Sequence, residues 1–256
     1  MTMGRMRTGK VFQTKRVGGK REVFELGEHF FDFPWEEDLG FGDSPRTLGE
    51  PQVSALEWDL AYREGTPSWE TGEPAPELVQ LVKQNRIPRG TALDIGCGTG
   101  ANAVFLAEEG FEVTAVDISP TAIERARTRA ALAGVNIHFV VDDVFHFIRS
   151  CPTRFGFLLD AGFYPYVRGH SLSAYLDFLW RASRPGSYCL VLAGHAAETA
   201  EGAQPGVTEE DLRLELGRLF EFIDLRTVRL GSPLRPEGYL GWCCFLHRPI
   251  PPNLRG

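Results

Sequence analysis

The stretch TALDIGCGTGAN, Thr91 to Asn102, decides the fold of this chain. A short apolar strand is expected at 92–95 and a helix at 101–109, on either side of a tight turn. The turn holds three glycines: Gly96, Gly98 and Gly100. Because glycine has no side chain, backbone amides and the helix N-terminus can approach a ligand closely at such a turn. The stretch therefore predicts a nucleotide-type cofactor bound where a strand ends.

Strand-like and helix-like segments alternate along the rest of the chain. Helices are expected at 76–84, from Ser119 onward, and at 172–182, and strands at 110–116, 135–141, 155–159 and 188–193. Thr208 and Asp211 match a capping box, which predicts a helix running to about Phe220. Two strand-like runs, 220–230 and 238–248, then follow with no helix between them. This order predicts an α/β fold: a parallel sheet covered on both faces, with an antiparallel hairpin at one edge.

Composition narrows the classes of protein. The chain has 256 residues, of which 43% are apolar, enough for a large core. It has no uncharged apolar run of about 18 residues and no apolar signal-peptide core at its start, so we expect a cytoplasmic protein without a membrane partner. Its five cysteines form no Cys-x-x-Cys pair and no cluster at zinc spacing, which predicts reduced thiols and no metal site.

Charge is unevenly distributed. Residues 1–21 carry seven Lys or Arg and no acid, whereas residues 22–50 carry nine acids and one Arg, in a chain of net charge −7. A net-acidic body makes nucleic acid an unfavourable partner. We expect residues 1–50 to be an extension whose aromatic side chains pack on a domain at 51–256, as an active-site cover, a dimer contact or a simple strap. Those aromatic residues are Phe24, Phe30, Phe31, Phe33, Trp35 and Phe41. The sequence leaves the oligomeric state open.

The glycine turn alone does not choose its cofactor. Gly96-x-Gly98-x-x-Ala101, with Asp117 about 20 residues later, also satisfies the fingerprint of dinucleotide-binding proteins. An NAD-dependent oxidoreductase is therefore an open alternative. Asp94, two residues before the first glycine, argues against it, because a carboxylate repels a pyrophosphate and suits a ligand with an amino group and a sulfonium.

Five segments, in order over residues 91–194, resemble the motifs of class I S-adenosylmethionine-dependent methyltransferases. The acid followed by Gly-x-Gly-x-Gly is the first, and EVTAVDISPTAIERAR resembles the second. The other three segments, HFVVDDVFHF, FGFLLDAGFYPYV and SRPGSYCLVLAG, resemble the family's later motifs. The resemblance implies a Rossmann-like, seven-stranded, mostly parallel sheet with helices on both faces and an antiparallel last strand. It also implies S-adenosyl-L-methionine as cofactor. Beside a methyltransferase and an NAD-dependent oxidoreductase, a third possibility is a non-catalytic protein that retained the cofactor fold.

The resemblance also implies roles for individual residues. Asp117 would hold the ribose hydroxyls, with Ile118 beside the adenine. Asp143 and the backbone amide of Val144 would read the adenine edge, with Asp142 as a close rival for Asp143. The cofactor-binding set from the glycine stretch comprises Asp94, Gly96, Gly98, Gly100 and Asn102.

Upstream, the run WDLAYREGTPSWETGEPAPEL, Trp58 to Leu78, is called here the aromatic segment. It resembles a segment of the thiopurine, thiol and tellurite-resistance methyltransferases, in which a helix bearing Trp and Tyr lies over the cofactor. Tyr62 would then reach the methionine carboxylate, and Trp69 would cover the methyl-bearing sulfur. Ordinary packing is the alternative role for these aromatics. The chain has Asp160-Ala161-Gly162 where thiopurine methyltransferases carry Asp-Arg-Gly, so that arginine contact is absent.

These likenesses imply methyl transfer to a small molecule by in-line displacement, with thiol sulfur as the first acceptor class and oxygen or nitrogen close behind. A thiolate needs no base, whereas a hydroxyl or protonated amine does. Candidate catalytic residues follow the fourth and fifth strands of the expected sheet: Asp160, Tyr164, His170 and His195. Asp160 also belongs to the cofactor-binding set, in which its backbone carbonyl would reach the cofactor amine while its side chain caps the next turn. Tyr164 can instead be a pocket wall, and the two histidines can lie in loops.

Overall fold

The computed structural model describes residues 12–17, 20–25, 55–198 and 206–251. The chain divides into two compact units, Met1–Thr47 and Leu48–Gly256. In the first unit, β1 (Phe12–Val17) and β2 (Lys20–Glu25) pair as an antiparallel hairpin that the sequence analysis did not anticipate. The side chains of the N-terminal aromatic residues lie outside the described residues.

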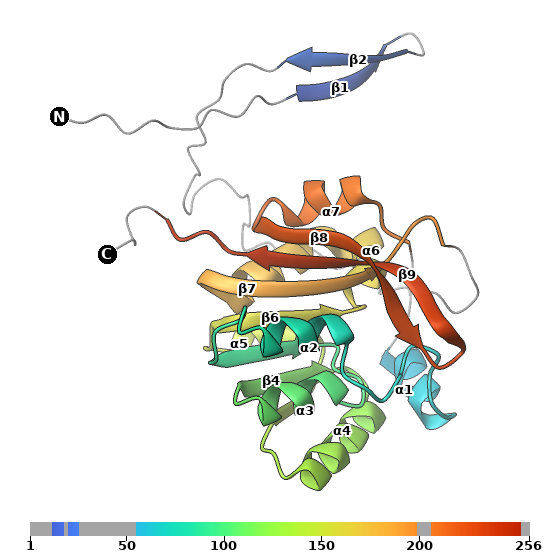
Figure 1. Ribbon diagram of the computed structural model, residues 1–256, viewed down its shortest axis with the longest axis vertical. Helices are drawn as coiled ribbons and strands as arrows, with labels where there is room; N and C mark the ends of the chain where they lie inside the picture. The colour runs from blue at the N-terminus through green and yellow to red at the C-terminus, as the bar shows by residue number, and fades with distance from the viewer. Residues whose placement is uncertain (1–11, 18–19, 26–54, 199–205, 252–256) are drawn as a thin grey trace, which may run out of the picture. The chain divides into compact units, whose positions relative to one another are not determined.

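The second unit contains a seven-stranded sheet with the order β5-β4-β3-β6-β7-β9-β8 (Figure 1). Its strands are β3 (Thr91–Ile95), β4 (Glu112–Asp117), β5 (His138–Val141), β6 (Phe155–Ala161), β7 (Ser183–Gly194), β8 (Glu221–Ser232) and β9 (Arg235–His247). The first five strands pair in parallel, and β9 pairs antiparallel with both β7 and β8. The predicted mostly parallel sheet with a hairpin at one edge is confirmed.

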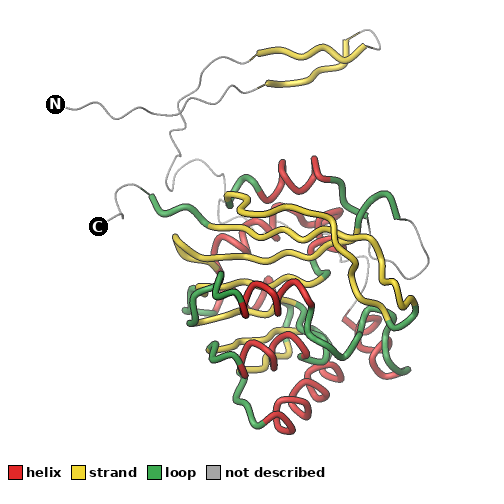
Figure 2. Tube along the Cα trace, in the orientation of Figure 1, coloured by secondary structure: helices red, strands yellow, loops and turns green. Residues whose placement is uncertain are grey.

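Helices cover both faces of this sheet (Figure 2). One face packs against α2 (Pro76–Lys83), α3 (Ala101–Glu108) and α4 (Pro120–Ala133), and the other against α5 (Val144–Ser150), α6 (Tyr164–Ala182) and α7 (Glu209–Leu216). Strand residues therefore alternate between two apolar cores: Cys243 and Phe245 of β9 belong to one, and Cys244 and Leu246 to the other. A sheet buried on both faces needs such near-continuous apolar strands.

Local signals placed most helices correctly. Ser119 caps α4 by accepting a bond from the Ala122 amide, and Thr208 forms the expected capping box with Asp211 at the start of α7. The structure differs from the prediction in two segments, the one after β5 and the one after β6. The short helix α5 was not expected, and α6 begins at Tyr164 rather than near residue 172. Among the described residues no helix is long and apolar enough to span a bilayer.

Candidate functional site

Three buried carboxyl groups meet at the C-terminal ends of neighbouring parallel strands. Asp94 is the penultimate residue of β3, and Asp117 is the last residue of β4. Asp160 is the penultimate residue of β6 and lies beside Ile95 in the strand register. Because parallel strands end at one edge of the sheet, all three carboxyls lie around the glycine turn. Their side chains are almost fully buried. The sequence predicted each of them from its place at a strand end.

The glycine turn has left-handed backbone at two positions that also leave no space for a side chain. Gly100 has φ +80°, and a Cβ on it would lie 2.8 Å from Ala126 Cβ of α4, so this glycine lets α3 and α4 approach each other. Gly98 has φ +54°, and its Cβ would lie 2.9 Å from the Tyr62 hydroxyl. Cys97, between Gly96 and Gly98, is buried, and burial raises the pKa of its thiol well above the ordinary value, which makes it unreactive.

Asp117 joins the turn to the following strand end. Its Oδ2 accepts a hydrogen bond from the Gly98 amide at 2.8 Å, and its Oδ1 accepts one from the Ser119 amide at 2.9 Å. Burial raises the pKa of this carboxyl, although these amide bonds partly offset the effect. Each oxygen retains a further acceptor site, so the carboxylate can still receive two ligand hydroxyls.

One oxygen of Asp94 is without a partner among the described residues. Within the part of the chain that the structure describes, its Oδ2 is the buried side-chain oxygen that has no hydrogen-bond partner. Burial, together with the negative charges of Asp117, Asp160 and Glu70, raises the pKa of Asp94 to about 8. Such an oxygen fits a ligand that brings a positive charge or donors, which S-adenosylmethionine does and a phosphate does not.

The N-terminus of α3 gives a second argument about the ligand. A pyrophosphate in a dinucleotide site binds the free amides at this end of the helix. Here the Thr99 amide already donates to Glu70 Oε2 at 3.1 Å, so a carboxylate of the protein lies where a phosphate would bind. Glu70 was not anticipated from the sequence, in which only its position after Trp69 marks it. The site thus favours a cation over a dinucleotide.

The expected adenine end lies at the start of α5. Asp143 is the N-cap of this helix, and its Oδ1 accepts bonds from the Phe145 and His146 amides at 2.7 and 3.3 Å. Asp142 instead accepts a bond from the Asp143 amide and lies 2.8 Å from His146 Nδ1. Val144 is the first residue of α5, and both amide bonds to Asp143 involve the same oxygen, Oδ1. Its other oxygen can face a ligand, as the predicted role requires.

The aromatic segment begins with α1 (Ala55–Arg63). Tyr62 is buried, and its hydroxyl accepts a bond from Trp69 Nε1 at 3.2 Å. Trp58 makes edge-to-face contacts with Trp69 and with Tyr166 of α6, at ring-centroid distances of 5.4 and 5.2 Å. Trp69 is 38% exposed. These rings form one aromatic wall that joins α1 to α6, as expected for a segment lying over the site.

Asn102 has a different contact from the predicted one. Its Oδ1 accepts a bond from the Ala75 amide at 2.8 Å, which ties α3 to the start of α2. This bond fixes the side chain and leaves the Nδ2 donors available, so the predicted contact with a cofactor stays a prediction. Ile118, by contrast, is half-buried directly after Asp117.

Asp160 organises the start of α6 rather than facing an acceptor. Its oxygens accept bonds from the Phe163 amide at 2.8 Å, the Tyr164 amide at 3.0 Å and the Tyr175 hydroxyl at 2.7 Å. Burial raises the pKa of this carboxyl to about 6, although the same bonds act in the opposite direction. The capping alternative for Asp160 is the one that this geometry favours.

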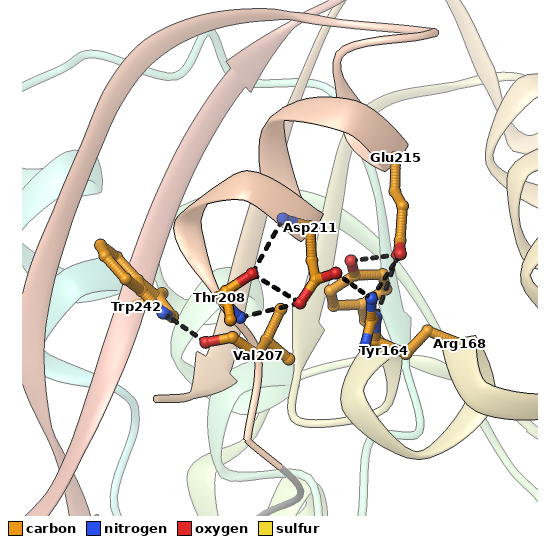
Figure 3. A network of polar contacts seen from close by, with 7 residues as sticks. All are labelled: Tyr164, Arg168, Val207, Thr208, Asp211, Glu215 and Trp242. Atoms are coloured by element: carbon orange, nitrogen blue, oxygen red, sulfur yellow. Dashed lines mark hydrogen bonds and ion pairs between the residues drawn. The ribbon is translucent and has the colours of Figure 1, made fainter. Parts of the chain in front are cut away.

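Tyr164 belongs to a polar network between α6 and α7 (Figure 3). Its hydroxyl donates to Glu215 Oε2 at 2.5 Å, and Arg168 binds both oxygens of the same carboxylate. Arg168 also pairs with Asp211 at 2.8 Å. The tyrosine ring is fully buried. Its hydroxyl is therefore engaged in joining two helices, and the Arg168 charge is compensated by two acids rather than open to an anionic substrate.

The two histidines lie in different surroundings. His170 is exposed within α6, one residue before a kink at Ser171, and not in a loop ahead of the helix. His195 directly follows β7, and its ring stacks on Trp242 at 4.6 Å. His195 Nδ1 accepts a bond from the Ala197 amide at 2.9 Å, so in the neutral ring the proton lies on Nε2. That tautomer has no free lone pair with which to remove a proton.

Comparisons with known proteins agree with this geometry. The family described as methyltransferase domain matches residues 92–186. The chain is 33% identical over 168 residues to 2-heptyl-1-hydroxyquinolin-4(1H)-one methyltransferase of Mycobacteroides abscessus. The aligned region covers 64% of this chain and 73% of that protein. It is 39% identical over 69 residues to probable thiol methyltransferase 2 of Arabidopsis thaliana, covering 27% of this chain and 30% of the relative.

A solved structure is also similar. It is described as "Conversion of a Disulfide Bond into a Thioacetal Group during Echinomycin Biosynthesis" and superposes with a TM-score of 0.67 at 27% sequence identity. The match covers 77% of this chain and 93% of that one. The similarity therefore extends over the sheet and the helices on both of its faces.

Proposed function

This chain belongs to the class I S-adenosylmethionine-dependent methyltransferases, and from that premise we propose that it methylates a small molecule at an atom that arrives already deprotonated, a thiolate sulfur first. The chain is an enzyme of the transferase class, and S-adenosyl-L-methionine is its cofactor. When bound, the cofactor supplies a methyl group on a positively charged sulfur. The protein's task is to hold donor and acceptor in line and to keep water out.

We assign the cofactor to the acidic edge of the sheet. Asp117 would hold the ribose, Asp143 with the Val144 amide and Ile118 the adenine, and Tyr62 with Trp69 the aminoacyl end. The unpartnered oxygen of Asp94 supports this assignment, because a cationic ligand would remove its desolvation penalty. Gly96 is exposed in the turn and has a left-handed φ of +64°, which fits close approach of a ligand to the backbone.

The observation that carries the acceptor proposal is that three of the four predicted catalytic residues already have partners, while the fourth, His170, is exposed on α6 one residue before the kink at Ser171. Asp160 is bonded to the start of α6, the Tyr164 hydroxyl to Glu215, and His195 Nδ1 to the Ala197 amide. A general base needs a free lone pair within hydrogen-bond reach of the acceptor. An acceptor that ionises in solution avoids this requirement. A thiol, with a reference pKa near 8.5 for cysteine, does so readily near neutral pH.

Sulfur is further supported by two of the similar proteins described above. One is a probable thiol methyltransferase, although the match covers less than a third of it, and the other solved structure is described by the conversion of a disulfide into a thioacetal. Methylation of a thiolate forms a carbon–sulfur bond as the bond from the methyl carbon to the cofactor sulfur breaks. No proton has to move in that step, so the geometry around His195 and Asp160 imposes no obstacle.

A second candidate acceptor is an acidic hydroxyl on a flat heteroaromatic ring. Of the two relatives described above, 2-heptyl-1-hydroxyquinolin-4(1H)-one methyltransferase is the one similar to this chain over more residues. The wall formed by Trp58, Trp69 and Tyr166 offers aromatic faces and edges against which such a ring can pack. An N-hydroxyl group on an electron-poor ring also ionises more easily than an alcohol, so it shares the feature on which the proposal depends.

The experiment is a pH–rate series with acceptors of graded acidity. The wild-type protein would be supplied with labelled cofactor and with aryl and alkyl thiols whose pKa values span several units, with 2-heptyl-1-hydroxyquinolin-4(1H)-one alongside. We expect the pH at half-maximal kcat/KM to move with the pKa of each acceptor. A single midpoint shared by all acceptors would show that a base on the protein ionises them, and would overturn the proposal. Faster transfer to an amine panel than to any thiol or hydroxyl would do the same.

A further inference from the structure

We propose that Glu70 is a further cofactor-binding residue: its carboxylate is the counter-ion for the amino group of the cofactor's aminoacyl end, and it excludes phosphate-bearing nucleotides from the same turn. The inference rests on the proposed function, in that S-adenosylmethionine occupies the acidic edge of the sheet. It concerns a residue of the aromatic segment to which the resemblance assigned no role, outside the five motifs of residues 91–194.

The first step is where Glu70 lies. Its Oε2 accepts a bond from the Thr99 amide at 3.1 Å and would lie 3.0 Å from a Cβ on Gly98. The Tyr62 hydroxyl would lie 2.9 Å from the same Cβ. A carboxylate and a phenol hydroxyl are therefore placed together over the backbone of the turn. The missing side chain of Gly98 is what makes room for both.

The second step is that Glu70 is fixed in this position. Its Oε1 accepts a bond from the Gly72 amide at 3.1 Å, which closes its own turn. Arg129 of α4 then joins that turn to the glycine turn, because its guanidinium donates to Gly72 O at 2.8 Å and to Thr99 O at 3.1 Å. A side chain held from both sides loses little conformational freedom when a ligand binds.

The third step is charge. Glu70 adds negative charge to a site in which Asp94 and Asp117 are already buried, and it raises the pKa of both carboxyls. Asp94 Oδ2 has no partner among the described residues, so the protein leaves one oxygen of this acidic cluster unsatisfied. Like charges at close range are unfavourable unless a cation is bound between them. The arrangement points to a positively charged ligand group at Glu70.

The fourth step is the chemistry of the aminoacyl end. An amino acid carries one ammonium and one carboxylate, which need an anion and a donor side by side. Glu70 provides the anion and Tyr62 the donor, because each oxygen can form a further hydrogen bond beside those it makes within the protein. A nucleotide ending in phosphates presents only negative charge to this pair and meets the Glu70 carboxylate at Thr99, just before the N-cap of α3. One residue would thus serve both to bind and to discriminate.

The test compares three adenosine ligands by calorimetry on the full-length protein: S-adenosylhomocysteine, 5′-methylthioadenosine and ADP. The first two share the adenosine and the thioether, but only the first has the aminoacyl group. For Glu70→Gln we expect S-adenosylhomocysteine to bind about tenfold or more weakly and methylthioadenosine to be nearly unchanged. ADP affinity should rise. Glu73→Gln, the same change at an exposed position in the same turn, should leave all three affinities unaltered.

The ratio of the affinities for S-adenosylhomocysteine and methylthioadenosine distinguishes two roles of Glu70: contact with the aminoacyl group, and support of the turn alone. If Glu70 only stiffens the turn, both thioethers weaken equally, the ratio is constant, and the proposal is overturned. Unchanged binding of S-adenosylhomocysteine, or no gain for ADP, also counts against it. If Glu70→Gln does not fold, Glu70→Asp keeps the charge at a shorter reach and should preserve the ratio. Failure of the wild-type protein to bind S-adenosylhomocysteine would instead overturn the proposed function.

Discussion

Asp59 of α1 accepts a 2.8 Å hydrogen bond from the hydroxyl of Ser119, the residue that caps α4. The same carboxylate oxygen accepts the Thr121 amide at 3.0 Å, and both side chains are almost fully buried. Ser119 in turn donates its own amide to Asp117. One buried contact therefore joins the aromatic segment to the strand end that is expected to hold the ribose. Together with the bond from Arg125 of α4 to Tyr62 O at 2.6 Å, it fixes α1 against α4.

Replacing Asp59 with Ala should lower the free energy of unfolding by about 2 kcal/mol, because two buried donors lose their acceptor. The same change should weaken S-adenosylhomocysteine binding several-fold, since α1 would no longer be fixed to α4. Urea unfolding and calorimetry measure the two effects. Glu64→Ala, at an exposed position just after α1, is the matched control and should change neither. Wild-type stability in the Asp59 variant would show that other contacts hold α1.

Asp94 predicts a pH dependence of the cofactor-free protein. Its pKa is raised from 3.8 to about 8, so between these values the folded protein keeps a proton that the unfolded chain has lost. Stability should then fall as pH rises through this range, and level off above it. Asp160, whose pKa is raised to about 6, adds a step of the same sign. Melting temperatures from pH 5 to 9 would record the decline.

Asp94→Asn should remove the upper part of that decline and raise the melting temperature at pH 8, while abolishing tight binding of the cofactor. A charged carboxylate is destabilising in the empty site and useful only when the ligand is present, so stability and binding should change in opposite directions. Asp177→Asn, which breaks an ion pair with Arg181 on the surface of α6, should leave the pH profile unchanged in shape. A variant with the wild-type profile would contradict the role given to Asp94.

Much of this architecture could be predicted from the sequence because its signals are local. Ser119, Thr208 and the three glycines mark helix starts through short-range backbone chemistry, and the structure has helices there. The helix α5 was missed because seven residues give too little periodicity to distinguish it from a loop, and its cap, Asp143, was interpreted only as a ligand contact. The early start of α6 was hidden by Gly169 and the kink at Ser171.

The candidate site was predictable only in part. Strand ends locate Asp94, Asp117 and Asp160, but the sequence does not show which side chains they meet. The bonds of Glu70 to the glycine turn span 29 residues, and those of Tyr164 to Glu215 span 51. Contacts at such separations depend on how helices pack, and no local pattern encodes them. The structure therefore shows which side chains the strand-end residues meet, which the sequence alone does not.

The bond between Tyr164 and Glu215 predicts a structural variant. Tyr164→Phe should cost about 1 kcal/mol of stability by removing one hydrogen bond, and should change kcat by less than about threefold. Glu215→Ala should cost more, because it leaves both the buried hydroxyl and Arg168 without their main acceptor. Thermal unfolding and steady-state rates would separate the two effects. A loss of kcat of a hundredfold in Tyr164→Phe, with stability intact, would restore Tyr164 as a catalytic residue.

His195 gives the sharpest test of a reaction without a base on the protein. With Nδ1 accepting the Ala197 amide and the ring stacked on Trp242, its expected role is to hold the chain after β7 in place. His195→Gln should therefore raise KM for the acceptor and lower kcat less than about tenfold, whereas loss of a general base costs about 10² to 10⁴. Both constants should be measured with a thiol and with a less acidic hydroxyl acceptor. If kcat falls a thousandfold with the hydroxyl alone, His195 must turn its ring on binding, and acceptors that need deprotonation would then belong among its substrates.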